Sequence, residues 1–76
     1  MENILNKKII TAVQKHIPQN QKTVNYLMEL LDLSKESSYR RIRGEKGFSA
    51  QELYIISRDL NISIDEMLDS GKKERV

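Results

Sequence analysis

Apolar residues recur at helical spacing in five segments of the chain, and no segment shows the alternating pattern of a strand. The first helix is predicted over residues 2–16. It ends before Pro18, because a proline pushes the residue before it out of the α region. Its inward side is predicted to hold Ile4, Leu5, Ile9, Ala12, Val13 and either His16 or Ile17.

Two short helices are predicted next, with about three residues between them. The second helix has Thr23 as its predicted N-cap and stops by about Asp32. Ser34 can cap a third helix over residues 35–43, and Gly44 stands where a left-handed C-cap favours glycine. The second helix is expected to turn Leu27, Leu30 and Leu31 inward.

Two capping boxes mark the starts of the last two helices. Ser49 is followed by Glu52, and Ser63 by Glu66, so each serine oxygen and each carboxylate can bind a free backbone N–H group at the helix start. Gly71 is predicted to end the fifth helix. Helices this short are unstable alone in water, so they must share one core. The predicted fold is therefore all-α, a compact five-helix bundle.

The short connection between the second and third helices is typical of a helix-turn-helix unit, which projects its second helix outward. Residues 23–34 (TVNYLMELLDLS), 40–44 (RRIRG) and 60–68 (LNISIDEML) extend the likeness. Over roughly residues 4–69 the chain resembles the phage repressor and Cro family of helix-turn-helix domains, the lambda repressor-like or XRE type. The resemblance implies transcription regulation through sequence-specific binding of double-stranded DNA, with helix 35–43 in the major groove. It also implies two-fold dimers on half-sites about one helical turn apart.

The chain departs from that family at three positions. Val24 stands where a phosphate-binding glutamine is common, Met28 where a small residue is usual, and Asp32 where the turn has a glycine. In the strict register of the family, Ser38 and Arg41 would point inward. The resemblance then implies that bases are read by Lys35, Glu36 and Arg40.

A second register follows from the apolar residues of the third helix, Tyr39 and Ile42. At about 100° per residue they lie about 60° apart and would define the buried side, with a turn one residue longer than usual. This register is the one that the pattern favours. It predicts that Ser37, Arg40 and Arg41 face outward, and Arg40 faces outward in both registers. The candidate base-reading residues are therefore Lys35, Glu36, Ser37, Arg40 and Arg41.

These side chains suit DNA. An arginine presents a planar fork that matches guanine O6 and N7, and serine can bond to several bases. Glu36 suits a nucleic-acid surface only if it accepts from a cytosine amino group or pairs with Arg40 four residues later. Free N–H groups at the start of the second helix would attract a phosphate. The candidate phosphate-binding residues are Lys22, Thr23, Arg43 and Lys46.

The length and composition of the chain argue against several classes of function. Seventy-six residues allow one domain. The chain has no cysteine and one histidine, which argues against disulfides and a metal site and suits a reducing cytoplasm. It has no glycine-rich phosphate loop and no apolar run long enough to span a membrane. We therefore expect no enzyme, no cofactor, no small-molecule substrate and no membrane partner.

Charge is distributed unevenly, although the net charge is only +2. Residues 22–48 hold six basic and four acidic residues, whereas residues 49–70 hold one arginine and five acidic residues. This distribution would point one side of the domain at a polyanion and the other away from it. The domain is expected over residues 1–70, and residues 71–76 are expected to be a basic tail or a linker to a further region.

One other function is compatible with the sequence. Val24, Glu36 and the shifted register also fit a protein-interaction or assembly module, or an antitoxin-like one, that keeps the fold without reading DNA. If the domain does read DNA, one copy would bury too little surface for tight specific binding. A homodimer or a further C-terminal domain is expected in that case.

Overall fold

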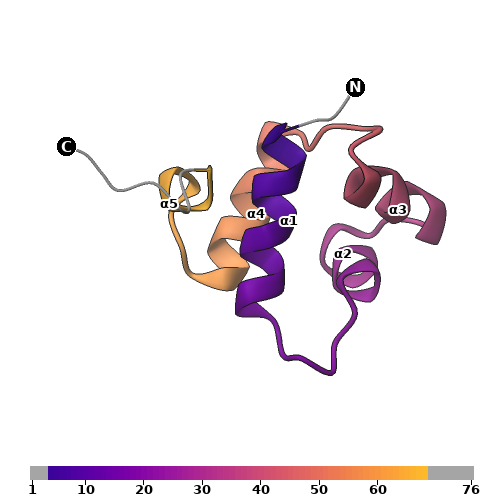
Figure 1. Cartoon of the computed structure of the whole chain (residues 1–76), viewed down its shortest axis with the longest axis horizontal. Coiled ribbons are helices and arrows are strands. Elements are labelled where there is room, and N and C mark those ends of the chain that lie inside the picture. Colours follow the sequence, from indigo (N-terminus) through magenta and orange to yellow (C-terminus); the bar gives the residue numbers. More distant parts are fainter. Residues whose placement is uncertain (1–3, 69–76) are drawn as a thin grey trace.

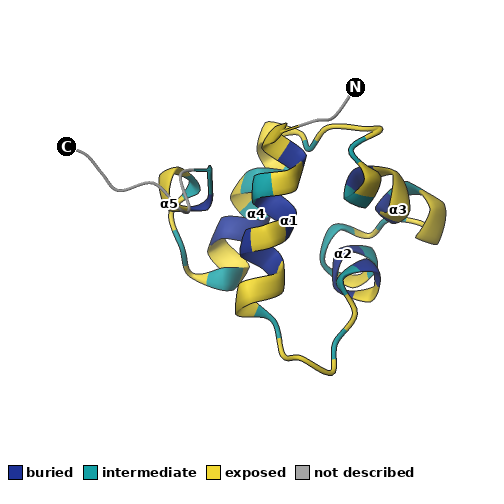
Figure 2. Cartoon of the chain, in the orientation of Figure 1, coloured by how far each residue is buried: buried dark blue, intermediate teal, exposed yellow. Residues whose placement is uncertain are grey.

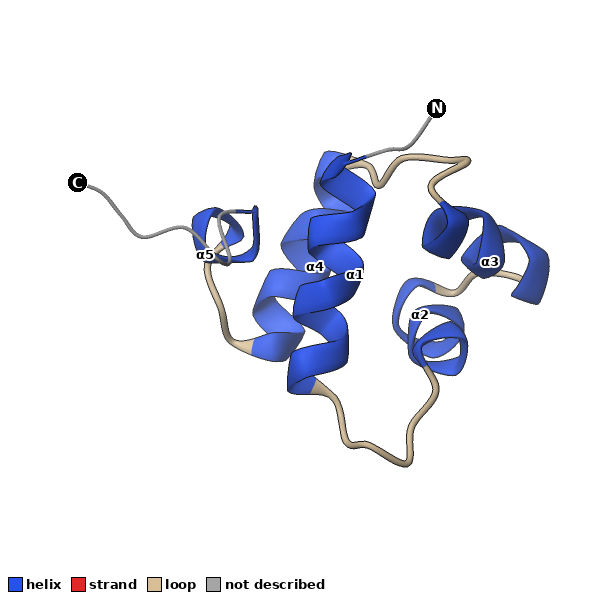
Figure 3. Ribbon diagram, in the orientation of Figure 1, coloured by secondary structure: helices blue, strands red, loops and turns tan. Residues whose placement is uncertain are grey.

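The computed structural model describes residues 4–68, and these residues form five helices and no strand, as the sequence predicts. Figures 1 and 3 show α1 and α4 crossing the middle of the molecule, with α2 and α3 on one side and α5 on the other. The predicted helix end at Gly71 and the tail at 71–76 lie outside the described residues. The helices are α1 Ile4–His16, α2 Thr23–Leu31, α3 Lys35–Arg43, α4 Ala50–Leu60 and α5 Ile64–Leu68.

The core is built around α1, which contacts all four other helices. Each large apolar side chain that is fully buried contributes about 1.5–3 kcal/mol to folding. Figure 2 shows buried positions on every helix, while the outer side of α3 is exposed. The apolar residues at the centre of the core are Ile9, Ile10, Ala12 and Val13 of α1, Tyr26 and Leu27 of α2, Ile56 of α4 and Met67 of α5.

The predicted inward side of α1 is wrong in its first turn. Ile4 and Leu5 are 64% and 56% exposed. The inward position there belongs to Asn6, which is 2% exposed and lies one turn before Ile10. Asn6 is buried because its amide binds two backbone carbonyl groups, as described below.

The predicted caps of α3 and α4 are confirmed. The hydroxyl oxygen of Ser34 accepts the N–H group of Ser37 at 3.1 Å, and Gly44 has φ 82° in the left-handed region. Ser49 and Glu52 form the full capping box, with reciprocal bonds of 3.1 and 2.9 Å.

The cap of α2 differs from the prediction, and that of α5 follows it in part. Thr23 is the first helical residue of α2, and the N-cap is Lys22, whose side chain makes no capping bond. At α5, the hydroxyl oxygen of Ser63 accepts the N–H group of Glu66 at 2.9 Å. No helix in the described part of the chain is long and apolar enough to cross a membrane.

The connection between α2 and α3 has the usual length, not the extra residue that the apolar pattern predicts. Asp32 ends α2 with φ 56° and ψ 49°, and its N–H group donates to the carbonyl of Met28. Glycine usually takes this left-handed conformation, and aspartate is one of the few other residues that tolerate it. Asp32 therefore makes the turn that a glycine makes elsewhere, and three residues, 32–34, separate α2 from α3.

Candidate nucleic-acid interface

The rotation of α3 follows the strict register. Ser38 is fully buried and Arg41 is 5% exposed, whereas Tyr39 is 38% exposed. The prediction that Tyr39 helps to form the buried side is therefore wrong, and Arg41 does not face outward. Ile42, the other inward residue of the shifted register, is half-buried and packs against the core.

Arg41 points inward because every part of its guanidinium group has an acceptor. Its Nε donates to Oε1 of Glu52 at 3.3 Å, and its Nη2 donates to Oε2 of the same carboxylate at 2.9 Å. Its Nη1 donates to the backbone carbonyl of Ser37 at 3.3 Å. A buried charge is tolerated only when it is paired and hydrogen-bonded in this way. Arg41 thus fixes α3 against α4, and it cannot reach a base edge in this position.

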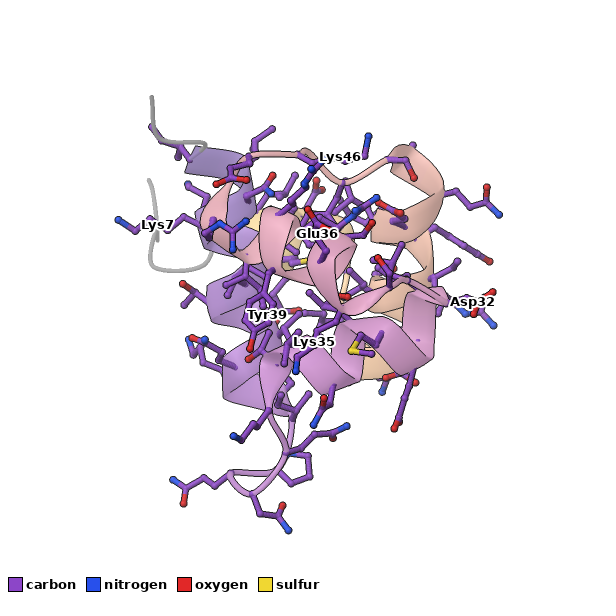
Figure 4. All side chains as sticks on the ribbon, turned by 90° about the vertical axis from the view of Figure 1, so that its right-hand side faces the viewer. Lys7, Asp32, Lys35, Glu36, Tyr39 and Lys46 are labelled. Atoms are coloured by element: carbon purple, nitrogen blue, oxygen red, sulfur yellow. The ribbon has the colours of Figure 1, made fainter. Side chains whose placement is uncertain are left out.

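The outward side of α3 carries charged residues and one aromatic residue. Glu36 and Arg40 form an ion pair of 3.2 Å across one helical turn, as the sequence suggests, and both side chains are more than half exposed. Exposed pairs of this kind contribute at most about 1 kcal/mol, so both groups are available to a partner. Figure 4 shows Lys35, Glu36 and Tyr39 on the face turned to the viewer. The exposed residues of α3 are Lys35, Glu36, Tyr39, Arg40 and Arg43, and Ser37 is half-buried.

The end of α3 and the following loop carry two of the residues predicted to bind phosphate. Arg43 donates to the carboxylate of Glu45 at 2.9 and 3.2 Å. The hydrogen bond raises the pKa of Arg43 and lowers the pKa of Glu45, so both remain charged over a wider pH range. Lys46 is exposed on the same loop, at the edge of this face in Figure 4.

The other two residues predicted to bind phosphate, Lys22 and Thr23, lie at the start of α2. Lys22 is exposed and Thr23 is half-buried. The side chain of Lys22, the N-cap residue, makes no hydrogen bond to the first N–H groups of α2. These groups and the positive end of the helix dipole can therefore attract an anion. Val24, at the position where the resembling family has a phosphate-binding glutamine, is buried.

Asn6 is a site residue that the sequence analysis missed. Its Nδ2 donates to the backbone carbonyl of Arg41 at 2.8 Å and to that of Lys46 at 2.8 Å. These two bonds join α1 to the last turn of α3 and to the loop beyond it. The only signal in the sequence is that a polar residue occupies an inward position on the helix period of Ile9 and Val13.

Comparison with known proteins adds a family. The family model described as the BetR domain matches residues 2–76 of the chain. This is a helical family of helix-turn-helix type, which agrees with the contact between α2 and α3. The comparisons with curated proteins and with solved structures found no match.

Proposed function

The chain belongs to the BetR domain family, a family that suggests a regulatory helical domain, and on this premise we propose that it binds double-stranded DNA in a sequence-specific manner. In this proposal α3 enters the major groove in the way of the phage repressor and Cro type, and the domain regulates transcription. The observation that carries the proposal is the outward side of α3. It presents Lys35, Arg40 and Arg43 to solvent on a helix whose opposite side is held in the core.

Arg40 and Glu36 suit the reading of a single G·C pair. The guanidinium group of Arg40 can donate to guanine O6 and N7, and the carboxylate of Glu36 can accept from the amino group of cytosine. Their ion pair holds the two side chains next to each other before DNA binds. Because the pair is exposed, exchanging it for base contacts costs little. Lys35 lies in the first turn of α3, and recognition helices of this type contact bases with residues near their N-terminus, so we propose a base contact for it as well.

The phosphate contacts would come from both sides of α3. Arg43 is the last residue of α3 and Lys46 lies in the loop that follows it, whereas Lys22 lies with the first N–H groups of α2. A phosphate would compete with Glu45 for Arg43, so the DNA must replace one anion with another at that position. Contacts of this kind fix the position of the protein on DNA without selecting a sequence.

The acidic side of the domain favours one orientation on DNA. Asp65 and Glu66 are exposed on α5, and Figure 1 shows α5 on the side of the molecule opposite α3. A polyanion is therefore repelled from that side and attracted to α3. One copy would bury less surface than tight specific binding needs, so we propose that two copies bind a site with two-fold symmetry.

The proposal is tested by fluorescence anisotropy on random duplex DNA from roughly 50 to 200 mM salt, followed by selection of preferred sequences. Each phosphate contact should steepen the log–log salt slope by about 0.9. A salt slope that corresponds to several phosphate contacts, together with a selected site of two-fold symmetry, would support the proposed function. No binding at low salt would overturn it and favour a protein-interaction module.

A matched pair of arginine variants sharpens this test. Arg40→Ala should weaken binding to the selected site by roughly 1–3 kcal/mol and relax the preference at one base pair. Arg58→Ala changes an exposed arginine on α4, which pairs with Tyr54 away from α3. It should leave the sequence preference unchanged. Equal effects of the two variants would remove Arg40 from base recognition.

A further inference from the structure

Tyr39 is a large apolar side chain on a helix face that is otherwise charged. It is 38% exposed, and no group in residues 4–68 forms a hydrogen bond with its hydroxyl. The strict register of α3 moves it from the buried side, where the apolar pattern places it, to the side that carries Lys35, Glu36 and Arg40. Tyr39 is not part of the hydrophobic core, so packing in the core does not account for a ring on this charged side of α3.

Helix geometry places Tyr39 at the edge of the surface that would meet the DNA. The centre of the buried side lies between Ser38 and Arg41, and the outward direction lies opposite it. At about 100° per residue, Tyr39 and Arg40 lie about 50° to either side of that outward direction. Tyr39 thus mirrors Arg40 across the axis of α3, and a helix that brings Arg40 to a base edge brings Tyr39 close to the neighbouring pairs.

The chemistry of the ring selects one feature of the groove. Base edges in the major groove offer hydrogen-bonding groups and a single apolar group, the C5 methyl of thymine, which apolar side chains contact. The charged neighbours of Tyr39 can form hydrogen bonds with the polar groups of the base edges. The ring of Tyr39 buries the most apolar surface when it contacts the methyl group. We infer that Tyr39 is a specificity-determining residue that recognises thymine through its C5 methyl group. This inference rests on the proposed function.

The test removes only that methyl group from the DNA. Thymines of the selected site are replaced by uracil one at a time, and dissociation constants are measured at fixed salt for wild type, Tyr39→Phe, Tyr39→Ala and Tyr54→Ala. Tyr54 is a second exposed tyrosine, on α4, and serves as the matched control. A thermal melt of each variant shows that it is folded.

At one thymine per half-site, wild type should lose affinity by roughly three- to fivefold on replacement by uracil, as expected when a group of methyl size is no longer buried. Tyr39→Phe and Tyr54→Ala should keep this ratio, and Tyr39→Ala should bind both sites equally.

Three results would overturn the inference while leaving DNA binding intact. The first is that replacement of thymine by uracil changes the affinity of wild type at no position. The second is that Tyr39→Ala keeps the wild-type ratio of dissociation constants between the uracil and thymine sites. The third is that Tyr39→Phe loses this ratio, which would assign the contact to the hydroxyl group. If wild type binds no duplex at all, the proposed function and the inference fail together.

Discussion

The carboxylate of Glu52 holds Arg41 and caps its own helix at the same time. Its Oε1 accepts from the backbone N–H group of Ser49 at 2.9 Å and from Nε of Arg41 at 3.3 Å, while its Oε2 accepts from Nη2 of Arg41 at 2.9 Å. One side chain therefore sets the start of α4 and the rotation of α3.

Glu52→Ala should destabilise the domain severely. It removes the capping box and leaves the guanidinium group of Arg41 buried without its partner, and breaking a buried pair in this way costs about 3–5 kcal/mol. Urea unfolding followed by circular dichroism measures the loss. The control is Glu36→Ala, which breaks the exposed pair with Arg40 and should cost less than about 1 kcal/mol. Equal losses would show that the Arg41–Glu52 pair does not support the fold.

Asn6→Ala should cost about 2–3 kcal/mol, because the backbone carbonyls of Arg41 and Lys46 would lose a buried donor. The same unfolding measurement tests this prediction. Asn25→Ala is the control, since Asn25 is exposed on α2 and alanine is the better helix former. If the Asn6 variant were as stable as the Asn25 variant, the two bonds to the end of α3 would carry no net energy.

Ser38→Ala should leave the stability unchanged or raise it slightly. The Oγ of Ser38 is buried and has no hydrogen-bond partner, so its removal relieves a desolvation cost. Ser57 is the matched buried serine on α4, and its Oγ donates to the carbonyl of Tyr54 at 2.9 Å. Ser57→Ala should therefore be the more damaging change, by about 1 kcal/mol. The reverse order in urea unfolding would refute this account.

The helices, the caps of α3 and α4 and most of the core could be predicted from sequence, because helical periodicity and capping are local properties. The rotation of α3 could not. Tyr39 is more apolar than Arg41, so a prediction from the local pattern places the tyrosine on the buried side of α3. The structure buries the arginine, because Glu52, eleven positions further along the chain, supplies a carboxylate that the helix itself does not contain. Asn6 was missed for the same reason, since its acceptors are 35 and 40 residues away.

Asp32→Gly should stabilise the domain by roughly 1 kcal/mol, because the left-handed conformation costs an L-residue about that much and costs glycine little. The greater freedom of glycine in the unfolded chain reduces the gain. Thermal unfolding measures the change, and the rotation of α3 should be retained. A loss of stability would mean that the side chain of Asp32 contributes more than its backbone conformation costs.

Tyr26 gives the domain a pH dependence on the alkaline side. Its hydroxyl donates to Oδ2 of Asp59 at 2.6 Å, joining α2 to α4. Burial raises the pKa of Tyr26 above its usual value near 10, and the bond to Asp59 raises it further.

The folded state therefore holds this proton at pH values where the unfolded chain has released it. The contribution of the Tyr26 proton to stability is complete below about pH 10, the pKa in the unfolded chain, and is lost as the pH rises above that value. Urea unfolding of wild type from pH 8 to 11 should show a fall in stability near the top of this range. Tyr26→Phe lacks the titrating group, so its stability should depend less on pH in this range. At pH 8 the variant should be less stable than wild type, because phenylalanine cannot form the hydrogen bond to Asp59. Parallel curves for the two proteins would show that Tyr26 does not release its proton more readily in the unfolded chain.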